Sequence, residues 1–227
     1  MPYLHLFLFG IYPYIALVVF LFGSLVRFER EQYTWRAEST QFLYRGQLRL
    51  GSNLFHIGVL GVFLGHLFGL LTPLVVWETL GVTLPAKQML AMGAGGVLGG
   101  IGMLGLLILL ARRFGNARLR AQTPPRDKIL LGWLLLTLGL GLATIPESMQ
   151  HTDGLTMVKF MFWAQHIATL RGDAAALILG TPLVFRTHIV FGLTFFMLFP
   201  FTRMVHTWSG FASVTYLTRA WQLVRPR

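Results

Sequence analysis

The chain has 227 residues, of which 55% are hydrophobic and only 12% are charged, and its mean hydropathy is +0.64. Because a soluble domain carries roughly 25% charged residues, this composition excludes an ordinary cytosolic globule, a disordered tail and a nucleic-acid-binding module. The net charge of +11 fits the basic loops of a polytopic membrane protein. The absence of cysteine excludes disulfides, iron–sulfur clusters held by this chain and covalently attached c-type haem.

Five apolar stretches, each near the roughly 20 residues that a bilayer core requires, predict an all-α membrane protein with five transmembrane helices. In chain order they lie at about 4–26, 50–71, 89–111, 129–145 and 183–205. The first stretch lacks a basic region before it and a small-residue cleavage site, so we expect an uncleaved span. We expect residues 1–227 to form a single integral membrane domain with a cytoplasmic tail at 207–227.

The basic residues alternate between the two sides of the membrane. Four Lys and Arg residues fall on the side of the N-terminus and fifteen on the other. Because basic residues are enriched in cytoplasmic loops, we expect the N-terminus outside and the C-terminus in the cytoplasm. The long connection before the fifth span contains an apolar stretch at 155–170, which predicts a helix on the outer membrane surface that ends at Gly172.

Four of the seven histidines lie within or at the edges of spans: His56 and His66 in the second, His188 and His206 in the fifth. The two spans run in opposite directions, so equal depth pairs His56 with His206 near the cytoplasmic face and His66 with His188 near the outer face. Ionisable side chains at such depth are functional candidates. Paired imidazoles from facing helices can hold haem iron from both sides, and without cysteine the predicted ligands are two non-covalent b-type haems.

The spacing of these histidines sets the geometry of the predicted bundle. His188 and His206 are 18 residues apart, five full turns, so we expect them on one helix face. His56 and His66 are 10 residues apart, about 80° around their helix, and Pro200 is expected to bend the fifth span.

Two further features of the spans have alternative interpretations. The glycines of the second and third spans allow either close helix packing or room for a macrocycle. Arg186 and Arg203, which precede His188 and His206, either pair with haem propionates or reach the membrane interface as solvated cations.

Several segments together resemble one known family. They are SNLFHIGVLGVFLGHLFGLLTP at 52–73, FRTHIVFGLTFFMLFPFTRMVHTWS at 185–209, TIPESMQHTDG at 144–154 and TYLTRAWQLVR at 215–225. The chain resembles, over nearly its whole length, the gamma subunit of bacterial respiratory nitrate reductase, a di-haem cytochrome b membrane anchor.

This resemblance implies roles for individual residues. It implies that His56 and His206 ligate the inner haem, nearer the cytoplasmic subunits, and that His66 and His188 ligate the outer haem, beside which quinol is oxidised. It also implies a quinol site formed by Lys87, Gly65 and His66, and Arg112 as a partner of a haem propionate.

The resemblance further implies an electron path across the bacterial inner membrane. Menaquinol or ubiquinol would be oxidised near the outer face, and electrons would reach the iron–sulfur and catalytic subunits of nitrate reductase in the cytoplasm, with no nucleic-acid partner. The alternatives are the cytochrome b anchor of another oxidoreductase, such as a hydrogenase or a heterodisulfide-reductase-like complex, a proton transporter with a histidine relay, and a purely structural anchor. The predicted spans contain no Asp or Glu, which argues against the transporter.

Overall fold

The computed structural model describes residues 2–30 and 45–208. Every regular element within these ranges is a helix, and five helical segments are long and apolar enough to cross a membrane. The predicted all-α membrane fold with five spans is therefore confirmed. The predicted tail at 207–227 lies outside the described residues, apart from its first two positions.

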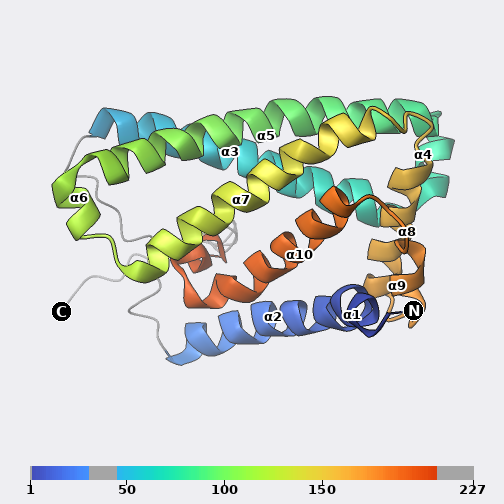
Figure 1. Ribbon diagram of the computed structural model, residues 1–227, viewed down its shortest axis with the longest axis horizontal. Coiled ribbons are helices and arrows are strands. Elements are labelled where there is room, and N and C mark those ends of the chain that lie inside the picture. Colours follow the sequence, from blue (N-terminus) through green and yellow to red (C-terminus); the bar gives the residue numbers. More distant parts are fainter. Residues whose placement is uncertain (1, 31–44, 209–227) are drawn as a thin grey trace, which may run out of the picture.

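The five long segments run side by side, and short helices close the two ends (Figure 1). We call the end that carries α1, α4, α8 and α9 the α8 end, and the opposite end the α6 end. The elements are α1 (Tyr3–Leu6), η1 (Phe7–Ile11), α2 (Tyr12–Arg30), α3 (Arg45–Leu71), α4 (Leu74–Thr79), α5 (Leu84–Gly115), α6 (Ala117–Ala121), α7 (Pro125–Ser148), α8 (Leu155–Ala168), α9 (Ala174–Leu177), α10 (Leu183–Leu198), η3 (Phe199–Phe201) and η4 (Arg203–Val205).

The third and fourth spans, α5 and α7, extend at both ends past the predicted 89–111 and 129–145. Hydropathy marks only the apolar middle of a helix, whereas the helix itself continues until its terminal backbone groups are capped. At the start of α5, the Thr83 hydroxyl accepts a hydrogen bond from the amide of Ala86 (3.4 Å).

The second and third spans, α3 and α5, pack closely through glycine. A Cβ placed on Gly58 would overlap the backbone of Gly102, and a Cβ on Gly105 would overlap the backbone of Phe55. Other glycines of these two helices, among them Gly100, have no atom of another residue within 4 Å of such a Cβ. Close helix packing therefore explains one part of the glycine pattern and not the rest.

The first span contains a π-helical turn, η1, which ends at Ile11, two residues before Pro13. Proline has no N–H to donate to the carbonyl four residues earlier, which is that of Phe9. The indole Nε1 of Trp163 in α8 donates to this carbonyl instead (2.9 Å). Both residues belong to a buried apolar cluster that ties α8 and α9 to the first span.

The predicted surface helix at 155–170 is present as α8, and it crosses one end of the bundle (Figure 1). It begins after Gly154, which has a φ of +80°. It ends at Ala168, before the predicted stop at Gly172, and Leu170 adopts a φ of 59°. The buried apolar residues of α8 pack against the bundle.

The fifth span departs from the predicted continuous helix 183–205. α10 ends before Pro200, and the two 3-10 turns η3 and η4 follow, with an extended residue, Thr202 (φ −121°, ψ 178°), between them. The predicted bend at Pro200 is confirmed, because proline removes a backbone donor and its ring crowds the preceding turn. The expectation that His188 and His206 share one face of a single helix is wrong.

Arg27 of α2 binds the carbonyls freed at this break. Its Nη1 donates to the carbonyl of Pro200 (2.6 Å) and to that of Thr202 (2.7 Å). The Thr202 hydroxyl accepts from the amide of Met204 (3.3 Å) and so caps η4. Because a bilayer offers no water to unpaired backbone groups, these contacts stabilise the break and attach it to α2.

We predict that Gly58→Ala destabilises the protein through the α3–α5 contact. The added Cβ overlaps backbone rather than a flexible side chain, and we expect the free energy of unfolding to fall by about 1–3 kcal/mol. Unfolding in detergent, followed by circular dichroism, measures the change. The matched control is Gly100→Ala on α5, where the Cβ meets open space and alanine favours the helix. Equal stability of the two variants would contradict the prediction.

Candidate functional site

The four histidines of the spans form two pairs between α3 and the segment formed by α10, η3 and η4. The ring centroids of His66 and His188 are 6.0 Å apart, with an interplanar angle of 50°. The centroids of His56 and His206 are also 6.0 Å apart, at 74°. The structure thus brings these rings together in the combinations expected from depth, with the His66 pair toward the α8 end and the His56 pair toward the α6 end.

Hydrogen bonds orient three of the four imidazoles through Nδ1. The acceptors are backbone carbonyls: that of Ser52 for His56 (2.7 Å), that of Val62 for His66 (2.8 Å) and that of Arg203 for His206 (2.6 Å). Because a carbonyl can only accept, Nδ1 donates in each ring, and Nε2 is the nitrogen that a neutral imidazole offers to a metal. This arrangement is typical of metal-ligating histidines.

The donor set of each pair consists of two imidazoles. No group of three His, Asp or Glu side chains converges as a metal site within residues 2–30 and 45–208. Two metal–nitrogen bonds of about 2.0–2.1 Å each account for most of a 6.0 Å centroid separation. Each pair therefore fits a metal ion whose remaining positions are filled by another ligand, as in a haem held from both sides.

The remaining three histidines have other partners. Nε2 of His5 lies 2.8 Å from the carbonyl of Ala175, and His151 bonds the carbonyl of Glu147 (3.1 Å). His166 donates to Asp173 (2.8 Å), and this hydrogen bond holds the pKa of the Asp173 carboxyl below its ordinary value. None of these three rings is paired with another histidine ring among the described contacts, in contrast to the other four.

One side of α3 is open next to the histidine pairs. The side chains of His56 and His66 are exposed although they lie in an apolar span. A Cβ placed on Gly65 or Gly69 would have no atom of another residue within 4 Å. The predicted quinol-site residue Gly65 therefore borders space rather than a neighbouring helix.

Gly141 of α7 makes room for the His188 ring. A Cβ at this position would lie 3.0 Å from Cε1 of His188, which is tighter than ordinary van der Waals contact. The sequence alone does not predict Gly141 as a site residue. Its only signal there is a glycine within the fourth predicted span, which does not reveal the ring it contacts.

Lys87 lies at the α8 end, buried at 4% exposure near the start of α5. Its Nζ donates to the carbonyl of Gly69 (2.9 Å), one turn beyond His66 on α3, and lies 4.9 Å from the centre of the Trp77 ring. A cation at a helix C-terminus stabilises the unpaired carbonyls there. The structure brings Lys87 to the end of α3 that carries Gly65 and His66.

Two glutamines complete the capping at this end. Gln165 of α8 donates to the carbonyls of Leu70 (3.0 Å) and Thr72 (3.3 Å), where α3 ends. Gln88 donates to the carbonyls of Ser148 and His151 (3.1 Å each), where α7 ends. The sequence analysis assigned no role to Gln165, and a lone amide side chain in a connecting segment offers little signal.

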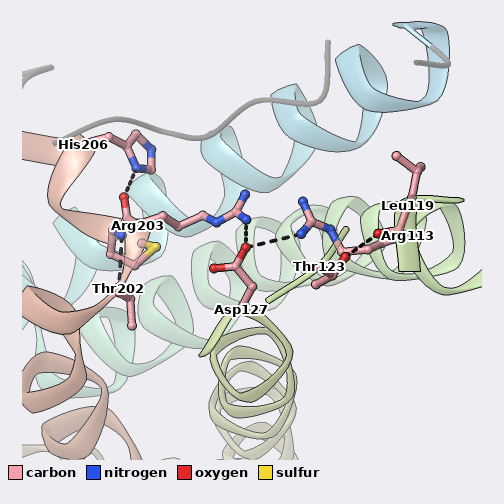
Figure 2. Close-up of polar contacts among 8 residues, drawn as sticks. Arg113, Leu119, Thr123, Asp127, Thr202, Arg203 and His206 are labelled. Carbon is pink, nitrogen blue, oxygen red and sulfur yellow. Dashed lines mark hydrogen bonds and ion pairs between the residues drawn. The ribbon is translucent and has the colours of Figure 1, made fainter. Parts of the chain in front are cut away.

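The three arginines predicted to contact propionates lie in different surroundings. Arg112 is buried at 6% exposure in the last turns of α5, at the α6 end. Arg186 lies two residues before His188, and its Nε is buried without a hydrogen-bond partner in the described part of the chain. Arg203 forms an ion pair with Asp127 of α7 (Figure 2).

Asp127 is a buried carboxylate that sequence reasoning missed. Its side chain is 1% exposed and contacts Arg113 of α5 (3.4 Å) as well as Arg203 of η4. The available signal was weak: Asp127 is the one acidic residue in the basic segment 112–128. It joins three elements at the α6 end.

Comparisons with known proteins agree over the whole length. A family model described as nitrate reductase gamma subunit matches residues 5–227. The chain is 48% identical over 227 residues to the respiratory nitrate reductase 1 gamma chain of Escherichia coli (strain K12), with 100% of both chains covered. It is 36% identical over 220 residues to the nitrate reductase gamma chain of Bacillus subtilis (strain 168), with 97% of each covered.

We predict that Gln165→Leu loosens the α8 end. The change removes the donor to two carbonyls at the end of α3, and leaving buried acceptors unpaired costs about 1–3 kcal/mol. Hydrogen–deuterium exchange should become faster in α8 and at the end of α3. Gln150→Leu is the matched control, because Gln150 is exposed at the same end. Unchanged exchange in the Gln165 variant would show that the amide does not hold α8 in place.

Proposed function

The chain belongs to the nitrate reductase gamma subunit family, and on this premise we propose that it is the di-haem b-type cytochrome subunit of a respiratory nitrate reductase. It oxidises a membrane quinol, either menaquinol or ubiquinol, and transfers the electrons to partner subunits. It does not reduce nitrate alone. The two histidine pairs carry the proposal, because each presents two imidazoles at a separation suited to one iron atom.

His66 and His188 hold one haem, and His56 and His206 hold the other. When bound, these groups take up and release single electrons, which conducts charge between the two faces of the membrane. On α3 the two ligands are 10 residues apart, about 15 Å along the helix axis. The carbonyl bonds to Nδ1 hold the rings of His56, His66 and His206 in orientation.

The arginines contribute positive charge near these pairs. Arg186 is placed to bind a carboxylate beside His188. Arg112 is placed to bind a carboxylate at the α6 end. Bidentate guanidinium contacts suit carboxylates such as haem propionates. Arg203 was expected in the same role, and its ion pair with Asp127 competes with a propionate for the guanidinium.

The quinol site lies at the α8 end. Lys87 Nζ donates to the Gly69 carbonyl and to Sδ of Met157 (3.7 Å), and its third N–H is the donor to a quinol oxygen. The open space at Gly65 lets the quinol ring approach His66. Oxidation here places the released protons on the α8 side.

We place the α8 end outside the cell and the α6 end in the cytoplasm of a bacterium, across its inner membrane. Residues 112–128 at the α6 end are strongly basic, which supports this orientation. The basic residues are Arg112, Arg113, Arg118, Arg120, Arg126 and Lys128. The catalytic and iron–sulfur subunits of nitrate reductase then dock at the α6 end and accept the electrons.

We predict that the purified complex contains two b-type haems in this chain and that each pair holds one. His66→Ala and His206→Ala should each lose one haem, because a single remaining imidazole holds iron from one side only. Reduced-minus-oxidised spectra and a pyridine haemochrome assay give the stoichiometry. His151→Ala is the control and should keep both. A folded wild-type protein without haem would refute the proposed function and favour a histidine relay.

We predict that Lys87→Ala slows haem reduction by quinol at least tenfold and weakens binding of a quinol analogue. The ammonium group is the proposed donor to the quinol oxygen, and a charged hydrogen bond contributes about 1.5–3 kcal/mol. Stopped-flow spectroscopy measures the rate, and dithionite reduction of both haems verifies that they remain bound. Lys159→Ala, an exposed lysine of α8, is the control. Unchanged quinol kinetics would remove Lys87 from the site.

A further inference from the structure

Asp127 connects three elements at the α6 end (Figure 2). It lies in the first turn of α7, and its Oδ2 contacts Arg113 of α5 and Arg203 of η4. Its side chain is 1% exposed, so its charge is removed from solvent. A buried carboxylate is retained only with compensating partners, and removal of one partner from such a pair is strongly destabilising. The position of η4 is therefore coupled to α5 and α7.

Arg203 links this carboxylate to the His206 imidazole. The Arg203 side chain binds Asp127, and the Arg203 carbonyl accepts the Nδ1–H of His206 at 2.6 Å. Figure 2 shows both contacts of Arg203, that of its side chain with Asp127 and that of its carbonyl with His206. The residue whose guanidinium is held by Asp127 is therefore the residue whose carbonyl orients the ring.

His206 differs from the other ligand candidates in how its backbone is held. His56 and His66 lie inside the continuous helix α3, and the carbonyls that bind their Nδ1 atoms belong to the preceding turn of the same helix. His206 follows the break at Pro200 and is preceded by a single 3-10 turn. Polar side-chain contacts that hold this segment include Arg27 to the carbonyls before it and Asp127 to Arg203, and the Trp208 ring stacks on Phe20 of α2.

We propose that Asp127 is a positioning residue for His206, which acts through Arg203 and sets the reduction potential of the haem held by His56 and His206. This inference rests on the proposed function. The hydrogen bond at Nδ1 determines the orientation and basicity of a metal-bound imidazole, and the Asp127 charge near the site favours the oxidised, more positive iron. The haem held by His66 and His188 is bound nearer the opposite end and is not affected.

The test is Asp127→Asn in the intact complex. Potentiometric titration in membranes should show a more positive midpoint potential for the haem held by His56 and His206. We expect a shift of about 59 mV, which corresponds to about a tenfold change in the one-electron equilibrium constant. The midpoint potential of the other haem should stay at its wild-type value. The low-spin ferric EPR signal of the same haem should shift, because the imidazole changes orientation. Asp127→Glu should restore both readouts in part.

Two control variants separate position from charge. Asp153→Asn makes the same change in the connection before α8, where the carboxylate accepts only from the amide of Leu155 among the described contacts, and should leave both haems unchanged. Arg113→Gln removes the other cation beside Asp127 without touching η4. This variant should make the midpoint potential of the haem held by His56 and His206 more negative and leave its EPR signal unchanged. If Asp127 acts through its charge alone, Asp127→Asn should also leave the EPR signal unchanged.

The outcomes decide the inference. A shift confined to one haem with an altered EPR signal, or selective loss of that haem, supports it. Unchanged potentials, equal shifts of both haems, or an unchanged EPR signal overturn it. If Asp127→Asn does not assemble, Arg203→Lys, which keeps the charge and removes the guanidinium that contacts Asp127, is judged by the same criteria. Wild-type protein without haem would refute the proposed function instead.

Discussion

Breaks in membrane helices expose backbone carbonyls that water cannot reach, and the protein must supply their donors. In this bundle the donors are side chains from other helices. Trp163 donates to the carbonyl of Phe9, which Pro13 leaves without its helical donor. Arg27 donates to the carbonyls at the break around Pro200, and Gln165 donates to a carbonyl at the end of α3. Each donor therefore satisfies a local requirement and fixes the packing of two elements. The arrangement of the bundle depends on these contacts because apolar packing alone provides little directional force among lipids.

The two histidines of each pair are held in different ways. On the α3 side, both rings lie in one helix that is anchored to α5 by backbone contact at Gly58 and Gly105. On the other side, His188 lies in α10 and His206 lies beyond the break, directly after η4, where Arg27 and Arg203 form polar contacts. Helix geometry thus determines the positions of the two rings on α3, whereas long-range polar contacts contribute to the position of His206.

Much of the fold follows from local sequence, and the site does so only in part. Hydropathy identifies five spans, and their alternating direction brings His56 toward His206 and His66 toward His188. The ends of α5 and α7 and the 3-10 turns after Pro200 do not follow, because capping and tertiary contacts determine them. Gly141 and Asp127 act through partners 47 and 76 residues away in the chain, His188 and Arg203. A single sequence offers no signal for such contacts.

Each histidine pair takes one ring from α3 and one from the last membrane segment. During synthesis, a chain that has emerged through α9 contains His56 and His66 but neither partner. Both pairs are therefore completed by a single late event, the insertion of α10 and its terminal turns beside α3. In a chain that ends before α10, both pairs are therefore incomplete at the same time.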